Sequence, residues 1–521
     1  MLIDDGVIVV DERGWRVLTE RLLAAKVPAT LTGVLQARID SLPPAGRLAL
    51  QQAAVVGHVF SQKALAAIDP AALEALPYLV HRRLVVPRDE GPDADGGEYA
   101  FQHQLLQQVT YESVLKHSQF VGHARVGTFW RAHAEVASAE QVNAATCHAL
   151  AEAYDHCRRC DPGTFVAWFD SQFSNYLGAY VGRILRPLAE SVLELCVRHR
   201  GPNDVETARA LTNLARLLLQ QRDTDDAEPL LARALRIQEG QLGTDHQDTA
   251  RTVAVLGGFH QARGDVRAAE PFFRRALGIR ERILGPEDPL TLGTLDNLAA
   301  VVIELGRFDE AESLFRRVLA AHERLHGAGA PGTARARTAL AEVLVKRGEL
   351  AQAEGLLRGA LAVQESVLGV EHPDVGLTQW HLAEALRAAG RIDEAEPLAR
   401  QMLKVVETAF GDKHEWTGWG LRSLAEIYLA QGQYAQAQQC AERAQAIFER
   451  HFGAQHSEVA AMLVVRARAM LKLGLFADAV PLLERVLMIQ SASADDSGRT
   501  RWSVNDLLAQ AGEGLARLGM E

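Results

Sequence analysis

The sequence predicts a mainly α-helical protein in which stacked helical hairpins form a right-handed α-solenoid behind a small N-terminal domain. Two observations carry this prediction: glycines recur at a fixed period from Gly201 to Gly453, and apolar residues between them follow helical spacing. The 521 residues are 48% hydrophobic and 23% charged, a balance typical of folded globular chains.

The repeat has a period of 42 residues and no insertion. Its glycines are Gly201, Gly243, Gly285, Gly327, Gly369, Gly411 and Gly453. One alanine position holds Ala227, Ala269, Ala311, Ala353, Ala395, Ala437 and Ala479, and a second small position holds Ala215, Gly257, Ala299, Ala341, Ala383, Ala425 and Ala467. Small residues at fixed places indicate close helix crossings, and one hairpin cannot bury its apolar stripe alone. Residues 201–490 are therefore predicted to form seven stacked units.

Each unit is predicted to hold two helices. In the stretch "TLGTLDNLAAVVIEL" apolar residues recur at helical spacing. Asp288 and Pro289 suit the N-cap and first turn of this helix, and Gly306 suits its left-handed C-terminus. The second helix, "FDEAESLFRRVLAAHERLHG", is expected to end at Gly327.

The segments that flank the repeats follow other patterns. Residues 131–200 are predicted to be degenerate helical repeats out of register with the series. Residues 491–521 are predicted to be a polar linker, "SASADDSGRT", and one helix that caps the stack.

The N-terminal 130 residues divide into two predicted parts. Residues 1–42 hold a hairpin that turns between Asp11 and Gly14, followed by a helix closed by prolines. Residues 43–130 hold three helices, the strands "VVP" and "YAF" around a Gly/Asp-rich loop, and a helix in "FQHQLLQQVTYESVL". Three helices, a two-stranded wing and a helix indicate a winged-helix-like domain.

The repeats, with loops such as "LGPEDP" and "LGVEHP", resemble the tetratricopeptide repeats of kinesin light chains and many bacterial regulators. The resemblance implies a concave groove, lined by the first helix of each unit, that holds a protein or peptide partner. By register, the groove should display Asn213, Arg216, Asp296, Asn297, Glu342, Trp380, His381, Glu384, Arg387, Trp419, Arg422 and Glu426.

Two kinds of groove residue are predicted to bind the partner. Relatives use groove asparagines to bond peptide backbone, and Asn213 and Asn297 stand at that position; the other units have Val255, Ala339, His381, Ser423 and Val465. Trp380 and Trp419, with Arg387 and Arg422 nearby, suit an interface hot spot. The alternative is ordinary repeat surface with half-buried tryptophans.

The first 130 residues resemble the region that follows the ATPase core in STAND-type signalling ATPases. The stretches that carry this resemblance are "VPATLTGVLQARIDSLPP", "LQQAAVVGHVF" and "FQHQLLQQVTYESVL". The last is similar to a Met-His-Asp motif, with Gln102 and Gln104 in place of the methionine and the aspartate. The resemblance implies that residues 1–42 include a remnant of the ATPase lid and that His103 can contact bound ADP. The local alternative is a histidine that packs and bonds at a helix N-terminus.

No G-x-x-x-x-G-K-[ST] loop occurs in the chain, so an ATPase domain would have to lie upstream or be supplied in trans. The chain therefore looks like the C-terminal half of a larger protein. A fragment, a late start and a split gene are the alternatives.

Other classes of function are disfavoured. A net charge of −11 argues against a broad nucleic-acid interface. The stretch "HCRRC" offers possible metal ligands, namely His148, His156, Cys157 and Cys160. A structural zinc site usually needs two Cys/His pairs, and no second C-x-x-C occurs, so no metal is expected. The sequence contains no nucleophile elbow and no dinucleotide-binding loop, so neither an enzyme nor a cofactor is predicted. The sequence shows no signal peptide, no long apolar run and no disulfide framework. It therefore predicts a cytoplasmic protein that does not contact a membrane.

The sequence thus predicts a non-catalytic interaction and regulatory module, the C-terminal sensor or scaffold half of a bacterial STAND-type ATPase. One alternative is a free-standing tetratricopeptide adaptor that binds peptides in its groove. Another is the C-terminal tail of an ATPase-linked adenylate or guanylate cyclase.

Overall fold

The computed structural model describes residues 8–11, 14–17, 29–88, 97–178, 181–221, 223–492 and 504–518. It divides into two compact units, here the N-terminal unit, residues 1–263, and the C-terminal unit, residues 264–521. Both units are built mainly of antiparallel helix pairs, which confirms the predicted α-solenoid class. None of the helices in the described ranges is long and apolar enough to cross a bilayer.

The N-terminal hairpin forms as predicted. Strand β1 (Ile8–Asp11) pairs antiparallel with β2 (Gly14–Val17), with Asp11 opposite Gly14 at the turn. Helix α2 (Ala29–Asp40) follows.

The small domain contains one strand more than the sequence predicts. Its elements are α3 (Pro44–Val56), β3 (Val59–Ser61), α4 (Gln62–Ile68), the 3-10 helix η1 (Pro70–Ala75), α5 (Leu76–His81), β4 (Val85–Arg88) and β5 (Glu98–Phe101). The antiparallel sheet has the order β3-β5-β4. Ser61 ends β3 and caps α4, since its Oγ accepts a hydrogen bond from the Ala64 amide at 3.1 Å. The winged-helix-like interpretation stays a prediction, now with a three-stranded sheet.

The helices that lead into the repeats are closer to register than expected. They are α6 (Gln104–Glu112), α7 (Lys116–Ala134), the 3-10 helix η2 (Ala139–Gln141), α8 (Ala144–Cys160), α9 (Pro162–Gly178) and α10 (Gly182–His199). Helices α9 and α10 begin 43 and 42 residues before α11 (Val205–Gln220) and α12 (Thr224–Leu242). Pro187 inside α10 also matches Pro229 inside α12. The expectation that residues 131–200 lie out of register is therefore wrong for α9 and α10.

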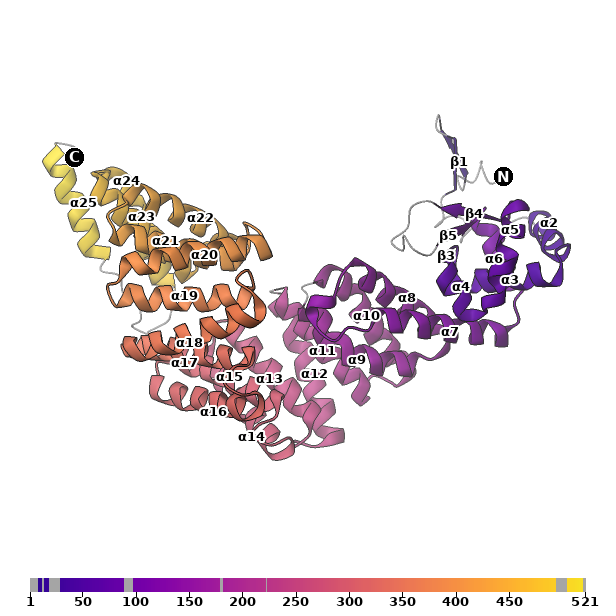
Figure 1. The fold of residues 1–521 in the computed structure, drawn as a ribbon, viewed down its shortest axis with the longest axis horizontal. Helices are drawn as coiled ribbons and strands as arrows, with labels where there is room; N and C mark the ends of the chain where they lie inside the picture. Colours follow the sequence, from indigo (N-terminus) through magenta and orange to yellow (C-terminus); the bar gives the residue numbers. More distant parts are fainter. Residues whose placement is uncertain are drawn as a thin grey trace. The chain divides into compact units, whose positions relative to one another are not determined.

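The later repeats give regular helix pairs. They are α13 (Gln247–Ala262) and α14 (Val266–Ile283), α15 (Pro289–Glu304) and α16 (Phe308–His326), α17 (Pro331–Arg347) and α18 (Leu350–Leu368), α19 (Pro373–Ala388) and α20 (Ile392–Phe410), α21 (Glu415–Ala430) and α22 (Tyr434–Phe452), and α23 (Ser457–Leu473) and α24 (Phe476–Ala492). Within the C-terminal unit, Figure 1 shows the pairs from α15/α16 to α23/α24 stacked one on the next.

Local sequence signals set the helix ends. The Asp288 carboxylate accepts a hydrogen bond from the Leu290 amide at 2.8 Å and caps α15, as predicted. Gly306 and Gly327 follow α15 and α16 with φ of 79° and 80°, a region that side chains with a Cβ rarely adopt. Ala311 of α16 is fully buried in the core of the C-terminal unit. The small positions therefore lie where the helices cross closely.

The last helix, α25 (Val504–Leu518), packs against α23 and α24. Val504 and Ala511 are buried in this contact. A Cβ on Gly514 would come within 2.4 Å of the Phe476 ring at the start of α24. The glycine is what allows α25 to approach α24 so closely.

Candidate functional site

Two predicted groove tryptophans lie side by side in the C-terminal unit. The ring centroids of Trp380 on α19 and Trp419 on α21 are 5.9 Å apart, and both residues are half-buried. The Arg422 guanidinium carbon lies 5.3 Å from the centre of the Trp419 ring, within cation–π range. We call Trp380, His381, Trp419 and Arg422 the tryptophan patch.

His381 extends the patch along α19. Its ring centroid is 4.7 Å from that of Trp380. Burial lowers the pKa of His381, although the nearby carboxylates of Glu342 and Glu384 oppose this shift. The ring is therefore neutral near pH 7, where it offers one hydrogen-bond donor and one acceptor.

The predicted arginines are held by carboxylates. Arg387 pairs with Glu384 at 2.6 Å and with Glu426 at 3.1 Å. Arg422 pairs with Glu426 at 3.2 Å and also with Glu458 on α23. Burial works to raise the pKa of Glu384, but Arg387, Ser423 and Arg422 together lower it. The ion pairs join α19, α21 and α23 into one polar layer that positions Arg422 over its tryptophan.

Asn297 lies on α15 with an exposed side chain, and its neighbour Asp296 is half-buried. Burial raises the pKa of Asp296 to about 6, opposed in part by Arg335. Neither side chain makes a hydrogen bond or an ion pair with another described residue. Helix α15 thus offers a ligand one amide and one carboxyl group.

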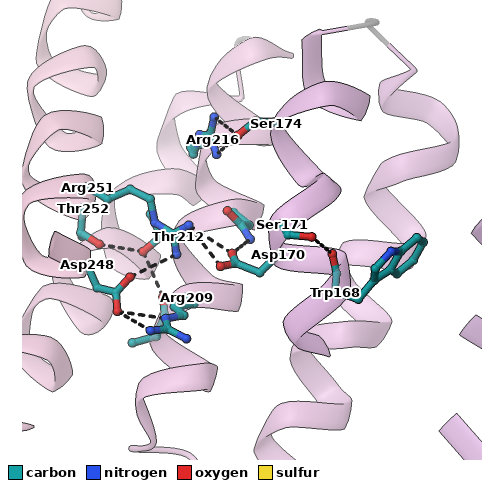
Figure 2. Close-up of polar contacts among 12 residues, drawn as sticks. Trp168, Asp170, Ser171, Ser174, Arg209, Thr212, Arg216, Asp248, Arg251 and Thr252 are labelled. Carbon is teal, nitrogen blue, oxygen red and sulfur yellow. Dashed lines mark hydrogen bonds and ion pairs between the residues drawn. The ribbon is translucent and has the colours of Figure 1, made fainter. Parts of the chain in front are cut away.

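Asn213, the other predicted asparagine, is placed differently. It is buried in the N-terminal unit, and its Nδ2 donates to Asp170 Oδ1 on α9 at 2.7 Å. Arg251 Nη1 donates to the same carboxylate at 3.1 Å, and Arg209 donates to Asp248 at 2.7 Å (Figure 2). We call Asp170, Arg209, Asn213, Asp248 and Arg251 the polar wall.

The polar wall leaves little room for a ligand. The cavity beside Asp170 and Asn213 is about 20 Å³, the size of a single water site. Arg216, also predicted for the groove, donates to Ser174 Oγ at 3.2 Å on the same face. To bond a peptide, the Asn213 amide would first have to leave Asp170. The sequence did not predict a role for Asp170, because α9 was expected to lie out of register with the repeats.

His103 is the N-cap residue of α6, with φ −146°. Its carbonyl accepts hydrogen bonds from the amides of Leu106 and Gln107 at 3.0 and 3.3 Å, and its side chain is exposed and makes no cap bond. Leu106 and Val109 form the buried face of the helix. The histidine therefore lies outside the apolar face, and its predicted contact with a nucleotide stays a prediction.

The residues around "HCRRC" do not converge. His156 is buried with its Nδ1 2.8 Å from His123 Nδ1, whereas the Cys160 thiol contacts the carbonyls of His156 and Cys157 on its own helix. His148 packs against another ring, that of Trp130. Within the described ranges, no group of three or more His, Cys, Asp or Glu side chains could hold a metal ion.

Comparison with known proteins gives a consistent picture of the repeats. A family model described as Tetratricopeptide repeat matches residues 186–240, 206–282, 248–324, 290–366, 332–408, 374–450 and 417–492. No match was found among curated proteins.

Several solved structures are similar. One is a Podosopora anserina protein described as a kinesin light chain with nearly identical TPR-like repeats. It is 27% identical over 40% of this chain and 97% of its own, with a TM-score of 0.33. BtubC from P. vanneervenii is 20% identical over 44% of this chain and 93% of its own, with a TM-score of 0.38. A STAND protein with a tetratricopeptide repeat sensor from Pyrococcus horikoshii is 10% identical over 90% of this chain and 68% of its own, with a TM-score of 0.61. The last shares the fold over most of the chain.

Proposed function

We propose, from the premise that this chain belongs to the tetratricopeptide repeat family, that it holds a protein partner on the tryptophan patch and reports that partner to an ATPase domain. Repeats of this family serve protein–protein interaction, for which stacked hairpins supply an extended surface. In this proposal the chain does no chemistry of its own.

One observation carries the choice of surface. Trp380 and Trp419 lie in contact, half-buried, with Arg422 over one ring. Tryptophan and arginine dominate interface hot spots because they bury a large area and still offer a polar group. A partner side chain that covers the two rings would exclude water from both.

The regulatory part of the proposal rests on the order of the domains. A small helical domain with a three-stranded sheet precedes the repeats, and the fold similarity to a STAND protein with a repeat sensor spans 90% of the chain. We propose that the repeats are the sensor and that the ATPase domain is joined to this chain or is a separate chain. His103, exposed at the N-terminus of α6, is the residue we assign to the nucleotide. The cytoplasm is the proposed setting, and the five cysteines are all free thiols.

Capture of partners from a lysate by the tagged full chain tests the surface. The Trp380→Ala/Trp419→Ala variant should lose partners that the wild type retains. Trp416→Ala, on the same helix but outside the patch, is the matched control and should retain them. Equal capture by the double variant and the control would remove the patch from the proposal.

Nucleotide binding tests the regulatory part. The chain alone should not bind ADP, whereas a complex with its ATPase domain should bind it. The affinity of that complex for ADP should fall about tenfold in His103→Ala, because one good contact is lost. His117→Ala, also an exposed histidine, is the control. Unchanged ADP affinity of the complex in His103→Ala would contradict the assigned contact.

A further inference from the structure

A pocket lies beyond the tryptophan patch, within the C-terminal unit. It has a volume of about 790 Å³, within the range of roughly 300–1,000 Å³ typical of ligand pockets. Helices α19, α21 and α23 contribute Arg387, Arg422 and Arg468, and α25 contributes Leu507. The C-terminal helix, and not another repeat, forms one wall.

The charges in this pocket are unbalanced. Arg387 and Arg422 are paired with glutamates, as described above. Arg468 and Lys472, one turn apart on α23, are exposed and make no hydrogen bond or ion pair with another described residue. Like charges four residues apart on a helix repel each other. Arg468 and Lys472 thus line the pocket without an ion pair to a described residue, whereas Glu426, which also lines it, is held by Arg387 and Arg422.

The repeat itself provides an internal comparison. Arg468 and Lys472 occupy the register positions of Glu342 and Lys346 three units earlier, and there the two side chains form an ion pair at 3.9 Å. Glu426, one unit before Arg468, also keeps the acidic residue. The last unit therefore has a guanidinium where the three units before it have a carboxylate, and the first unit has Arg216 at the same position.

The rest of the lining is mixed, with the polar side chains of Glu426, Tyr434 and Gln510 among apolar ones. Leu429, Leu471, Phe476 and Leu507 are among the residues that line the pocket. The close contact of Gly514 with Phe476 fixes α25 and with it the apolar wall. A ligand that fits this pocket combines a negative charge with an apolar side chain.

We propose that the pocket binds an acidic segment of the partner protein, with a partner carboxylate between Arg468 and Lys472 and a neighbouring apolar side chain against Leu507. This deepens the proposed function and rests on it, because the partner would continue from the tryptophan patch into the pocket through Arg422, which belongs to both. Charge complementarity excludes a basic segment from the same place.

Fluorescence anisotropy with the full chain tests the proposal. The probe is a labelled peptide of about ten residues, the length of a typical recognition segment, with glutamates around one leucine and one phenylalanine. A second peptide replaces each glutamate with lysine, and a third replaces the leucine and the phenylalanine with alanine. The wild type should bind the first peptide at least about tenfold tighter than either of the others.

Arg468→Glu is the decisive variant. It recreates with Lys472 the ion pair that Glu342 and Lys346 make in α17, so the fold should be retained. It should weaken the acidic peptide about tenfold or more. Arg450→Glu, an exposed arginine outside the pocket, should leave binding unchanged. Circular dichroism confirms the fold, and Arg468→Gln serves if Arg468→Glu does not fold.

Equal affinity of the wild type and Arg468→Glu for the acidic peptide would overturn the proposal, as would equal affinity for the acidic and the lysine peptide. If lysate partners depend on Trp380 and Trp419 but not on Arg468, the proposed function stands and this inference fails. If neither substitution affects capture, the proposed function itself fails.

Discussion

The polar wall of the N-terminal unit and the tryptophan patch of the C-terminal unit are built from the same repeat positions but use them differently. In the polar wall, Asp170 receives Asn213 and Arg251 beside a cavity of about 20 Å³. The tryptophan patch adjoins a pocket of about 790 Å³ with uncompensated cations. The polar wall pairs its charged groups with one another, although Asn213 Oδ1 and Arg251 Nε have no hydrogen-bond partner among the described residues. Beside the tryptophan patch, Arg468 and Lys472 have no ion pair with a described residue. We therefore propose that the first region stabilises the fold and that the second recognises a partner.

The largest expected effect is loss of the central carboxylate of the polar wall. Asp170→Ala would leave Arg251 and Asn213 without their acceptor and should cost about 2–3 kcal/mol, because a partly buried charge loses its partner. Urea unfolding and hydrogen exchange of residues 162–262 measure this. Ser174→Ala, which removes only an exposed bond to Arg216, should cost under about 0.5 kcal/mol. Equal costs for the two variants would contradict a stabilising wall.

Packing gives the next effect, independent of either surface. Ala311→Leu adds volume at a fully buried helix crossing and should cost about 1–3 kcal/mol by overpacking. Ala351→Leu, at an exposed position of α18, should change thermal stability little. Wild-type stability in Ala311→Leu would refute the close crossing and with it the register on which both surfaces are mapped.

Acidification should lower the stability of the N-terminal unit but not that of the C-terminal unit. Burial, reinforced by the charges of His156 and Arg159, lowers the pKa of His123 to about 3, and burial lowers the pKa of His156 to about 4. The stability from this neutral pair is complete above an unfolded pKa of about 6.5 and falls as the pH drops below it, by about 2 kcal/mol for the two imidazoles together at pH 6. Tyr111, whose hydroxyl is 2.9 Å from His123 Nε2, should report the change by fluorescence. A His123→Gln/His156→Gln variant should lose this pH dependence.

Asp296 in the C-terminal unit should show the smallest effect, with the opposite sign. Its pKa is raised by burial to about 6, so the ionised form is disfavoured in the folded protein. The contribution of this group to folding stability is complete below pH 3.8, its ordinary pKa, and is lost as the pH rises through 6. Asp296→Asn should therefore stabilise the chain by up to about 1 kcal/mol at pH 7 and by little at pH 4. Thermal melts at both pH values measure the difference. A destabilised Asp296→Asn at pH 7 would mean that the carboxylate has a favourable partner.

Much of the fold could be predicted because its signals are local. The glycine period placed the end of α16 at Gly327, and Asp288 with Pro289 placed the start of α15. Register also predicted Trp380 and Trp419 for the same hot spot, and their ring centroids lie 5.9 Å apart because residues near the same repeat position lie on neighbouring helices.

The remaining features depend on contacts that no local pattern reports. Asp170 binds Arg251, 81 residues later, and its role is visible only once α9 is in register. The pocket needs α25, which lies outside the repeat, and its free charge arises because Arg468 stands where the three preceding units have a glutamate. Asn213 fits the asparagine position of binding repeats, yet a partner within the chain already occupies it.

Partner capture by the full chain tests the central claim most directly when the two surfaces are altered side by side. Trp380→Ala/Trp419→Ala changes the tryptophan patch, and Arg209→Ala/Asp248→Ala removes an ion pair of the polar wall. We predict that the first variant loses the partners of the wild type and that the second, once shown to be folded, retains them. Loss of partners in the second variant with full capture by the first would contradict the account.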